Sequence, residues 1–205
     1  MARKRNDNTF GRKVFARNKR KYFLIVCEGK KTEPNYFNSF RITKNVIKLE
    51  IEGSGANTDS LVEAAFELKQ KRERVNGQRF DEVWCVFDRD SFTAHNFNRA
   101  LRLAENNGFK VAYSNEAFEL WYILHFEFLD AGINREQYFE KLGRYLGRPY
   151  EKNSNKIYEE IFERQNVAIK NAEKLLQRYD PPNPEQDKPS TTVHLLVEEL
   201  NKYLI

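Results

Sequence analysis

Long hydrophobic runs are absent from this sequence. No apolar stretch approaches the roughly 20 residues that a membrane-spanning helix needs, so we expect no contact with a membrane. The first residues are basic and have no apolar segment behind them, which is not the pattern of a secretory signal. These two absences together predict a cytoplasmic protein.

Cysteine and histidine are scarce, with two and three residues respectively, and their spacing matches no common metal site. Cys27 and Cys85 both lie inside apolar runs, so we expect reduced core residues rather than a disulfide. No Ser/His/Asp set, glycine-rich phosphate loop or dinucleotide fingerprint is present either. Residues 53–55 read Gly-Ser-Gly, which is too short to count as a phosphate loop.

Positive charge is concentrated at one end of the chain. Residues 1–21 contain nine lysines and arginines and one aspartate, a charge of +8, which leaves −3 for the rest of a chain whose net charge is +5. A basic arm neutralises phosphates, so nucleic acid is its expected partner. The alternative is a solvated leader. The candidate nucleic-acid-binding residues are Arg12, Lys13, Arg17, Lys19, Arg20 and, beyond the arm, Lys31.

Strand and helix patterns alternate through the first half of the chain. Strands are predicted at residues 22–27, 48–52, 83–87 and 110–114, with helices between them, which indicates an α/β fold with a parallel sheet between helices. Residues 116–126 are apolar nearly all round and predict a buried helix. Further helices are expected near residues 134–146, 155–164, 167–178 and 190–203, with Thr32, Ser190 and Thr191 as candidate N-caps.

The domain organisation follows from this pattern. We expect a basic arm at residues 1–20, an α/β core at residues 21–126, and a helical C-terminal part at residues 127–205 packed on that core.

Three carboxylates follow two of the predicted strands. Glu28 comes directly after the first strand, and Asp88 and Asp90 follow the third. Parallel strands end at one edge of a sheet, so the three could converge there. Carboxylates in one crevice repel one another unless a cation lies between them, and oxygen ligands favour Mg²⁺ or Mn²⁺. The alternative is ordinary loop aspartates that cap the next helix.

Other charged residues near this edge are candidates for the same site. Lys30 and Lys31 could hold a phosphate beside the metal or could be solvated loop lysines. Glu33 could be a supporting carboxylate, a general base or a favourable charge at a helix start. Glu119 stands in the most apolar helix, where a carboxylate needs a partner or a metal. His125 reads more readily as a structural histidine.

Several separated segments match the pattern of one known family. They are CEG at residues 27–29, TEPNYF at 32–37, VFDRD at 86–90, SN at 114–115, FELW at 118–121, LHF at 124–126 and PSTTVHLLV at 189–197. Through them the chain resembles the RloB-like family, whose members carry a Toprim-type catalytic domain. The resemblance covers roughly residues 20–200 and departs from the family pattern at Glu116, where that pattern has proline.

The resemblance implies a Toprim-like parallel sheet, shared with topoisomerases, bacterial primases and OLD-type nucleases. In those enzymes a glutamate after the first strand and an Asp-x-Asp after a later strand bind Mg²⁺, and the matching positions are Glu28, Asp88 and Asp90. RloB-like proteins resemble components of phage-defence and restriction-associated loci, often beside an AAA or ABC-type ATPase. This implies a nuclease effector of an abortive-infection type system.

The leading hypothesis is therefore a metal-dependent nuclease acting on DNA or RNA. Glu28 would orient the attacking water or act as its general base, Asp88 and Asp90 would hold Mg²⁺, and Lys30 or Lys31 would steady the phosphate, with Glu119 as a further catalytic candidate. The alternative is a non-catalytic subunit that binds a partner or nucleic acid. A primase-like polymerase is a weak third reading. Homo-oligomer formation is left open.

Overall fold

The α/β alternation predicted from the sequence is present in the computed structural model, which describes residues 20–55, 58–77, 79–89 and 93–205. The elements follow in the order β1 (Lys21–Cys27), α1 (Thr32–Asn38), β2 (Ile47–Gly53), α2 (Thr58–Asn76), β3 (Glu82–Asp88), α3 (Ala94–Asn106) and β4 (Lys110–Asn115). The C-terminal half adds α4 (Glu119–Ile123), α5 (Arg135–Leu146), α6 (Ile157–Ile161), the 3₁₀ helix η1 (Phe162–Arg164), α7 (Gln165–Leu176), β5 (Ser190–Thr191) and α8 (Val193–Asn201).

The five strands form one sheet in the order β2-β1-β3-β4-β5. The first four strands are parallel, and the two-residue β5 pairs antiparallel with the end of β4, where Ser114 lies opposite Thr191. The chain therefore runs from β1 outward to β2, returns past β1 to β3 and continues to β4. The order of the sheet reverses between β1 and β3.

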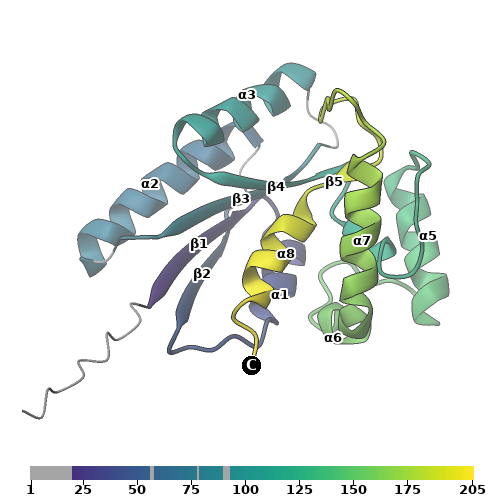
Figure 1. Ribbon diagram of the computed structural model, residues 1–205, viewed down its shortest axis with the longest axis horizontal. Coiled ribbons are helices and arrows are strands. Elements are labelled where there is room, and N and C mark those ends of the chain that lie inside the picture. Colours follow the sequence, from purple (N-terminus) through teal and green to yellow (C-terminus); the bar gives the residue numbers. More distant parts are fainter. Residues whose placement is uncertain (1–19, 56–57, 78, 90–92) are drawn as a thin grey trace, which may run out of the picture.

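Helices cover both faces of the sheet, so the central strands β1 and β3 are buried on both faces. Along β1, Phe23, Ile25 and Cys27 point to one face, and Leu24 and Val26 point to the other, as a period of two requires. Helices α2 and α3 pack on the Leu24 face, whereas α1 and α8 lie on the opposite face (Figure 1). The sheet is thus the middle layer of three.

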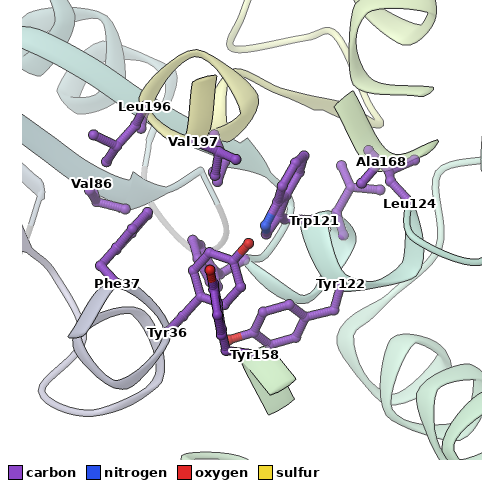
Figure 2. Close-up of a cluster of buried hydrophobic side chains, with 14 of the residues drawn as sticks. Tyr36, Phe37, Val86, Trp121, Tyr122, Leu124, Tyr158, Ala168, Leu196 and Val197 are labelled. Carbon is purple, nitrogen blue, oxygen red and sulfur yellow. The ribbon is translucent and has the colours of Figure 1, made fainter. Parts of the chain in front are cut away.

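An aromatic cluster joins the C-terminal helices to α1. Tyr36 of α1 lies with its ring centroid 5.6 Å from Tyr122 of α4 and 5.4 Å from Tyr158 of α6. Trp121 and Val197 of α8 belong to the same buried cluster (Figure 2). Aromatic rings at these separations favour edge-on contacts and bury a large area. This packing fixes α1 and α4 relative to each other.

Several local predictions were wrong. The helix expected over residues 116–126 is limited to α4, because an all-round apolar run carries no period that marks where a helix begins. Ser190 and Thr191 form β5, and Thr192 takes the N-cap position of α8, although Oγ1 of Thr191 accepts a hydrogen bond from the backbone N–H of Val193 over 3.3 Å. Thr32 is the first residue of α1, and its hydroxyl donates a hydrogen bond to Oδ1 of Asn153, 3.0 Å away, instead of capping the helix.

One simpler expectation is confirmed. Cys27 and Cys85 are free and buried. In the part of the chain that the structure describes, no helix is long and apolar enough to cross a membrane.

Candidate functional site

The candidate site lies where the order of the sheet reverses. In open α/β sheets the crevice outside the carboxyl ends of the strands at such a point is the usual ligand position. Here that position lies between the ends of β1 and β3, with α1 on one face and α2 and α3 on the other. A pocket of about 470 Å³ opens there, and we call it the acid pocket because Glu28, Glu33, Asp88 and Glu119 line it.

Glu28 and Asp88 are joined directly across the two strand ends. The backbone N–H of Asp88 donates a hydrogen bond to Oε2 of Glu28 over 3.1 Å, and the backbone N–H of Glu28 donates to the carbonyl oxygen of Val86 over 2.9 Å. The register of β1 and β3 brings these residues together, since Cys27 pairs with Val86. The predicted convergence of Glu28 with Asp88 is therefore present.

Two short helices supply the other carboxylates of the acid pocket. Glu33 stands in the first turn of α1 and Glu119 in the first turn of α4. Each precedes a tyrosine of the aromatic cluster, Tyr36 or Tyr122, by three residues, which places both members of each pair on one face of their helix. The contact between the two tyrosines therefore sets how Glu33 and Glu119 face the pocket.

The acid pocket holds its carboxylates in a poorly solvated environment. Glu33 is 5% exposed, Glu119 is 2% exposed and the side chain of Asp88 is 14% exposed. Burial raises the pKa of Asp88 well above its ordinary value, and the negative charges of the other three carboxylates raise it further. Burial likewise raises the pKa of Glu33, and Oε2 of Glu33 is buried without a hydrogen-bond partner among the described residues.

Tyr150 holds the Glu119 carboxylate. Its hydroxyl donates a hydrogen bond to Oε1 of Glu119 over 3.2 Å. Burial raises the pKa of the Tyr150 hydroxyl, and the charge of Glu119 raises it further, so the hydroxyl stays protonated and remains a donor. Glu119 therefore has the partner that its buried position demands.

Cations border the acid pocket on several sides. Lys30 and Lys31 belong to the loop after β1, Arg135 is the first residue of α5, and Lys152 comes from the loop between α5 and α6. Nη2 of Arg135 lies 3.7 Å from Oδ2 of Asp88. The charge of Lys152 lowers the pKa of Glu33 and so opposes part of the effect of burial. A phosphate entering the pocket would meet both acidic and basic groups.

Glycines allow the loops around the acid pocket to approach one another closely. A Cβ on Gly53 would lie 2.7 Å from the carbonyl oxygen of Gly29, and one on Gly55, whose φ is +62°, would lie 2.3 Å from Cε of Lys30. The segment Gly53-Ser54-Gly55 therefore packs against the loop that carries Lys30. Its function in the structure is close packing, and Ser54 supports it by donating to the carbonyl oxygen of Cys27 over 3.1 Å.

The structure brings some sequence candidates together and places others elsewhere. Glu28, Lys30, Lys31, Asp88 and Glu119 all line the acid pocket. Arg20 precedes β1, at the end of that strand opposite to Glu28, and its guanidinium lies 5.8 Å from the ring centroid of Tyr22. The remaining candidates, Arg12, Lys13, Arg17, Lys19 and Asp90, lie outside the described residues.

Sequence reasoning missed Arg135, Lys152, Asn153 and Tyr150. All four come from α5 or from the loop that follows it, far from the strand ends in sequence. No local pattern marks them, because only the packing of the C-terminal helices on the core brings them to the acid pocket. His125, whose role the sequence left open, does not line the pocket; it is 1% exposed, with Nδ1 2.9 Å from the carbonyl oxygen of Trp121.

Metal binding has no ready-made geometry within the described ranges. Among those residues, no group of three or more His, Cys, Asp or Glu side chains is arranged to hold a metal ion. The four carboxylates line one pocket without forming such a group.

Fold and site together define an α/β protein with an acidic pocket at the switch point of a parallel sheet. The family model described as RloB-like protein matches residues 23–200, and the chain belongs to the RloB-like family. A search of the curated proteins found no match, and a search of the solved structures found none either.

Proposed function

We propose that this protein is a Mg²⁺- or Mn²⁺-dependent nuclease that hydrolyses phosphodiester bonds in DNA or RNA, with its sheet acting as a Toprim-type catalytic core. The observation that carries the proposal is the link between Glu28 and Asp88 at the switch point of the sheet, where the Asp88 N–H donates to the Glu28 carboxylate over 3.1 Å. Glu33 and Glu119 face the same pocket.

The donors of the acid pocket fit a divalent cation. Its four acidic side chains offer only oxygen, which Mg²⁺ and Mn²⁺ prefer. Oε2 of Glu33 is buried without a hydrogen-bond partner among the described residues, and burial together with the charges of the other carboxylates raises the pKa of Asp88. A bound cation would give these oxygens a partner and favour the ionised form of Asp88. In this proposal Glu28 and Asp88 would hold the cation together with Asp90.

The chemistry divides among the residues around the acid pocket. A bound cation would stabilise charge on the phosphate and lower the pKa of a water molecule. Glu28 would orient the attacking water or accept its proton, and Lys30 would steady the negative oxygens of the scissile phosphate. Glu119, held by Tyr150, would take part as a second positioned carboxylate. The departing oxygen would take its proton from solvent.

A biological role follows from the family resemblance. We extend the proposal to an effector of a phage-defence or abortive-infection system whose activity an AAA or ABC-type ATPase partner controls. Membership of the RloB-like family supports this part of the proposal.

A cleavage assay tests the proposed activity. Purified protein is incubated with tRNA, single strands and duplex DNA in Mg²⁺, in Mn²⁺ and in EDTA, alongside Asp88→Ala and Glu28→Ala. We expect cleavage of at least one substrate that depends on the metal and is lost in both variants. Cleavage by Asp88→Ala at the rate of the unchanged protein would refute the assignment.

The second candidate is a non-catalytic subunit that binds a partner or nucleic acid through the same fold. The observation that favours it is that the described residues contain no group of acidic side chains already arranged around a metal position. Calorimetric titration with Mg²⁺ near neutral pH separates the two candidates, since only the nuclease requires a saturable site. Co-purification with a neighbouring ATPase in the absence of any cleavage would favour the second.

A further inference from the structure

A second cavity continues from the acid pocket along the loop between α5 and α6. It has a volume of about 680 Å³ and shares Lys31, Lys152 and Asn153 with the acid pocket. We call it the basic groove. The two cavities therefore meet at a wall formed by the α5–α6 loop, residues 147–156, and the start of α1.

The α5–α6 loop is fixed at several points, so the shape of the groove is built into the fold. The Thr32 hydroxyl donates to Oδ1 of Asn153, 3.0 Å away, and Nδ2 of Asn35 donates to the carbonyl oxygen of Asn153 over 2.8 Å. Tyr150 anchors the same loop to Glu119. These contacts hold Lys152 between the two cavities.

The charge of the basic groove is positive after its internal ion pair is counted. Arg148 makes a two-pronged contact with the Glu160 carboxylate, with Nη2 2.6 Å from Oε2, so these two charges offset each other. Lys31, Lys152 and Lys156 remain, against Glu151 alone. All three lysines are exposed, and none forms an ion pair with another described residue.

The groove offers nothing on which a base could stack. Its lining contains charged side chains, asparagines and a serine, and no aromatic or aliphatic residue. Such a surface would contact the phosphate oxygens of a nucleic acid, and these contacts do not depend on the base sequence. Cavities of this size enclose small ligands. We expect a few linked nucleotides of one strand to enter a cavity of about 680 Å³, and we expect the cavity to exclude a double helix.

We infer that the basic groove carries the sugar-phosphate backbone of a single nucleic-acid strand out of the acid pocket, over Lys31 and Lys152 to Lys156. This inference rests on the proposed nuclease function and adds to it the substrate form, a single strand recognised through its phosphates regardless of sequence. It also adds a binding surface formed by described residues to the basic arm that the sequence proposes.

Fluorescence anisotropy with labelled 20-nucleotide single strands, one oligothymidylate and one of mixed sequence, tests the inference in EDTA, where no cleavage interferes. The groove variant is Lys152→Ala with Lys156→Ala. The matched control is Lys71→Ala with Lys170→Ala, which removes two exposed lysines, on α2 and α7, that line neither cavity. Thermal melting checks that both variants fold.

We expect the groove variant to bind both strands roughly tenfold more weakly than the unchanged protein at low salt. Its log–log salt dependence should be shallower by about 1.4, since each phosphate contact on a single strand contributes about 0.7. The control should bind as the unchanged protein does, and duplex of the same length should compete poorly. Equal affinity of the groove and control variants would overturn the inference, as would better binding of duplex.

The same experiment separates this inference from the proposed function. If the groove variant loses binding but no substrate is cut in Mg²⁺, the binding surface stands and the nuclease proposal fails. If the unchanged protein cleaves and the groove variant binds and cleaves like the control, the nuclease proposal stands and the groove assignment fails.

Discussion

The backbone N–H of Asp88 donates a hydrogen bond to the carboxylate of Glu28, which ties the end of β3 to the end of β1 over 3.1 Å. The contact follows from the parallel register of the two strands. It keeps two acidic side chains close together although burial and like charge disfavour two ionised carboxylates there. The same two effects raise the pKa of Asp88.

Asp88→Asn should stabilise the metal-free protein at neutral pH. The pKa of Asp88 is raised in the folded state. Asp88 therefore does not destabilise the fold below its unfolded pKa, near 3.8, and its ionisation lowers the stability of the fold as pH rises through the folded pKa. Each unit of that rise corresponds to about 1.4 kcal/mol. Urea unfolding in EDTA at pH 7 and at pH 3 should show a gain at pH 7 that shrinks at pH 3.

The control for that measurement is Asp130→Asn, because Asp130 pairs with Arg178 at the surface. Exposed pairs contribute about 0–1 kcal/mol, so this variant should be neutral or slightly less stable. A loss of stability in Asp88→Asn at pH 7 would contradict the electrostatic description of the acid pocket.

Gly29→Ala should displace the Glu33 carboxylate. A Cβ at residue 29 would lie 2.1 Å from Oε2 of Glu33, and the buried side chain has little room to move away. We expect at least a tenfold loss of metal-dependent cleavage in a protein that still folds. Gly143→Ala is the matched control, because its Cβ would meet the carbonyl oxygen of Arg148 at 3.4 Å, an ordinary contact. Full activity of Gly29→Ala would show that the position of Glu33 is unimportant.

Tyr150→Phe removes the hydroxyl that holds Glu119 and should reduce the turnover rate more than it changes KM. The lost hydrogen bond should cost about 1 kcal/mol in the free energy of unfolding. Tyr179→Phe removes a comparable hydroxyl, which donates to the carbonyl oxygen of Pro189 over 2.8 Å away from the acid pocket. It should cost similar stability and leave cleavage unchanged. Equal cleavage activity of the two variants would show that the hydrogen bond to Glu119 is not needed for cleavage.

His125 should make the protein sensitive to mild acid. Burial lowers the pKa of His125 from 6.5 to about 4, so folding favours the neutral ring. Its contribution is complete above pH 6.5 and is lost as pH falls toward 4, a change of about 3 kcal/mol. His125→Asn, which can still donate toward the carbonyl of Trp121, should flatten the pH dependence of unfolding in that range. An unchanged pH dependence of the unfolding free energy in His125→Asn would contradict the assignment of this acid sensitivity to His125.

Local sequence patterns anticipate the sheet and half of the acid pocket. Glu28 and Asp88 directly follow apolar strands, and strand ends of a parallel sheet share one edge, so their meeting could be predicted. The two-residue β5 could not, because so short a segment has no period and pairs only through the fold of α7 and α8. The first residue of α4, which determines the position of Glu119, could not be predicted either, because it lies inside an apolar run.

Long-range packing determines the rest of the site. Lys152 and Tyr150 reach the acid pocket because the aromatic cluster around Tyr36 seats the C-terminal helices against α1. The contacts of Tyr36 with Tyr158 and of Thr32 with Asn153 join residues more than 100 positions apart, and a single sequence carries no local signal for them. The basic groove is therefore a product of tertiary structure, whereas the basic arm is visible in composition.

Cation binding tests the central claim most directly, because it does not depend on knowing the substrate. Mn²⁺ titration at neutral pH, followed by electron paramagnetic resonance of the free ion, should show saturable binding to the unchanged protein and to Asp130→Asn. The account predicts that Asp88→Asn loses this binding. Absence of saturable binding to the unchanged protein, or equal binding by Asp88→Asn, would contradict the assignment of the acid pocket as a metal-dependent catalytic site.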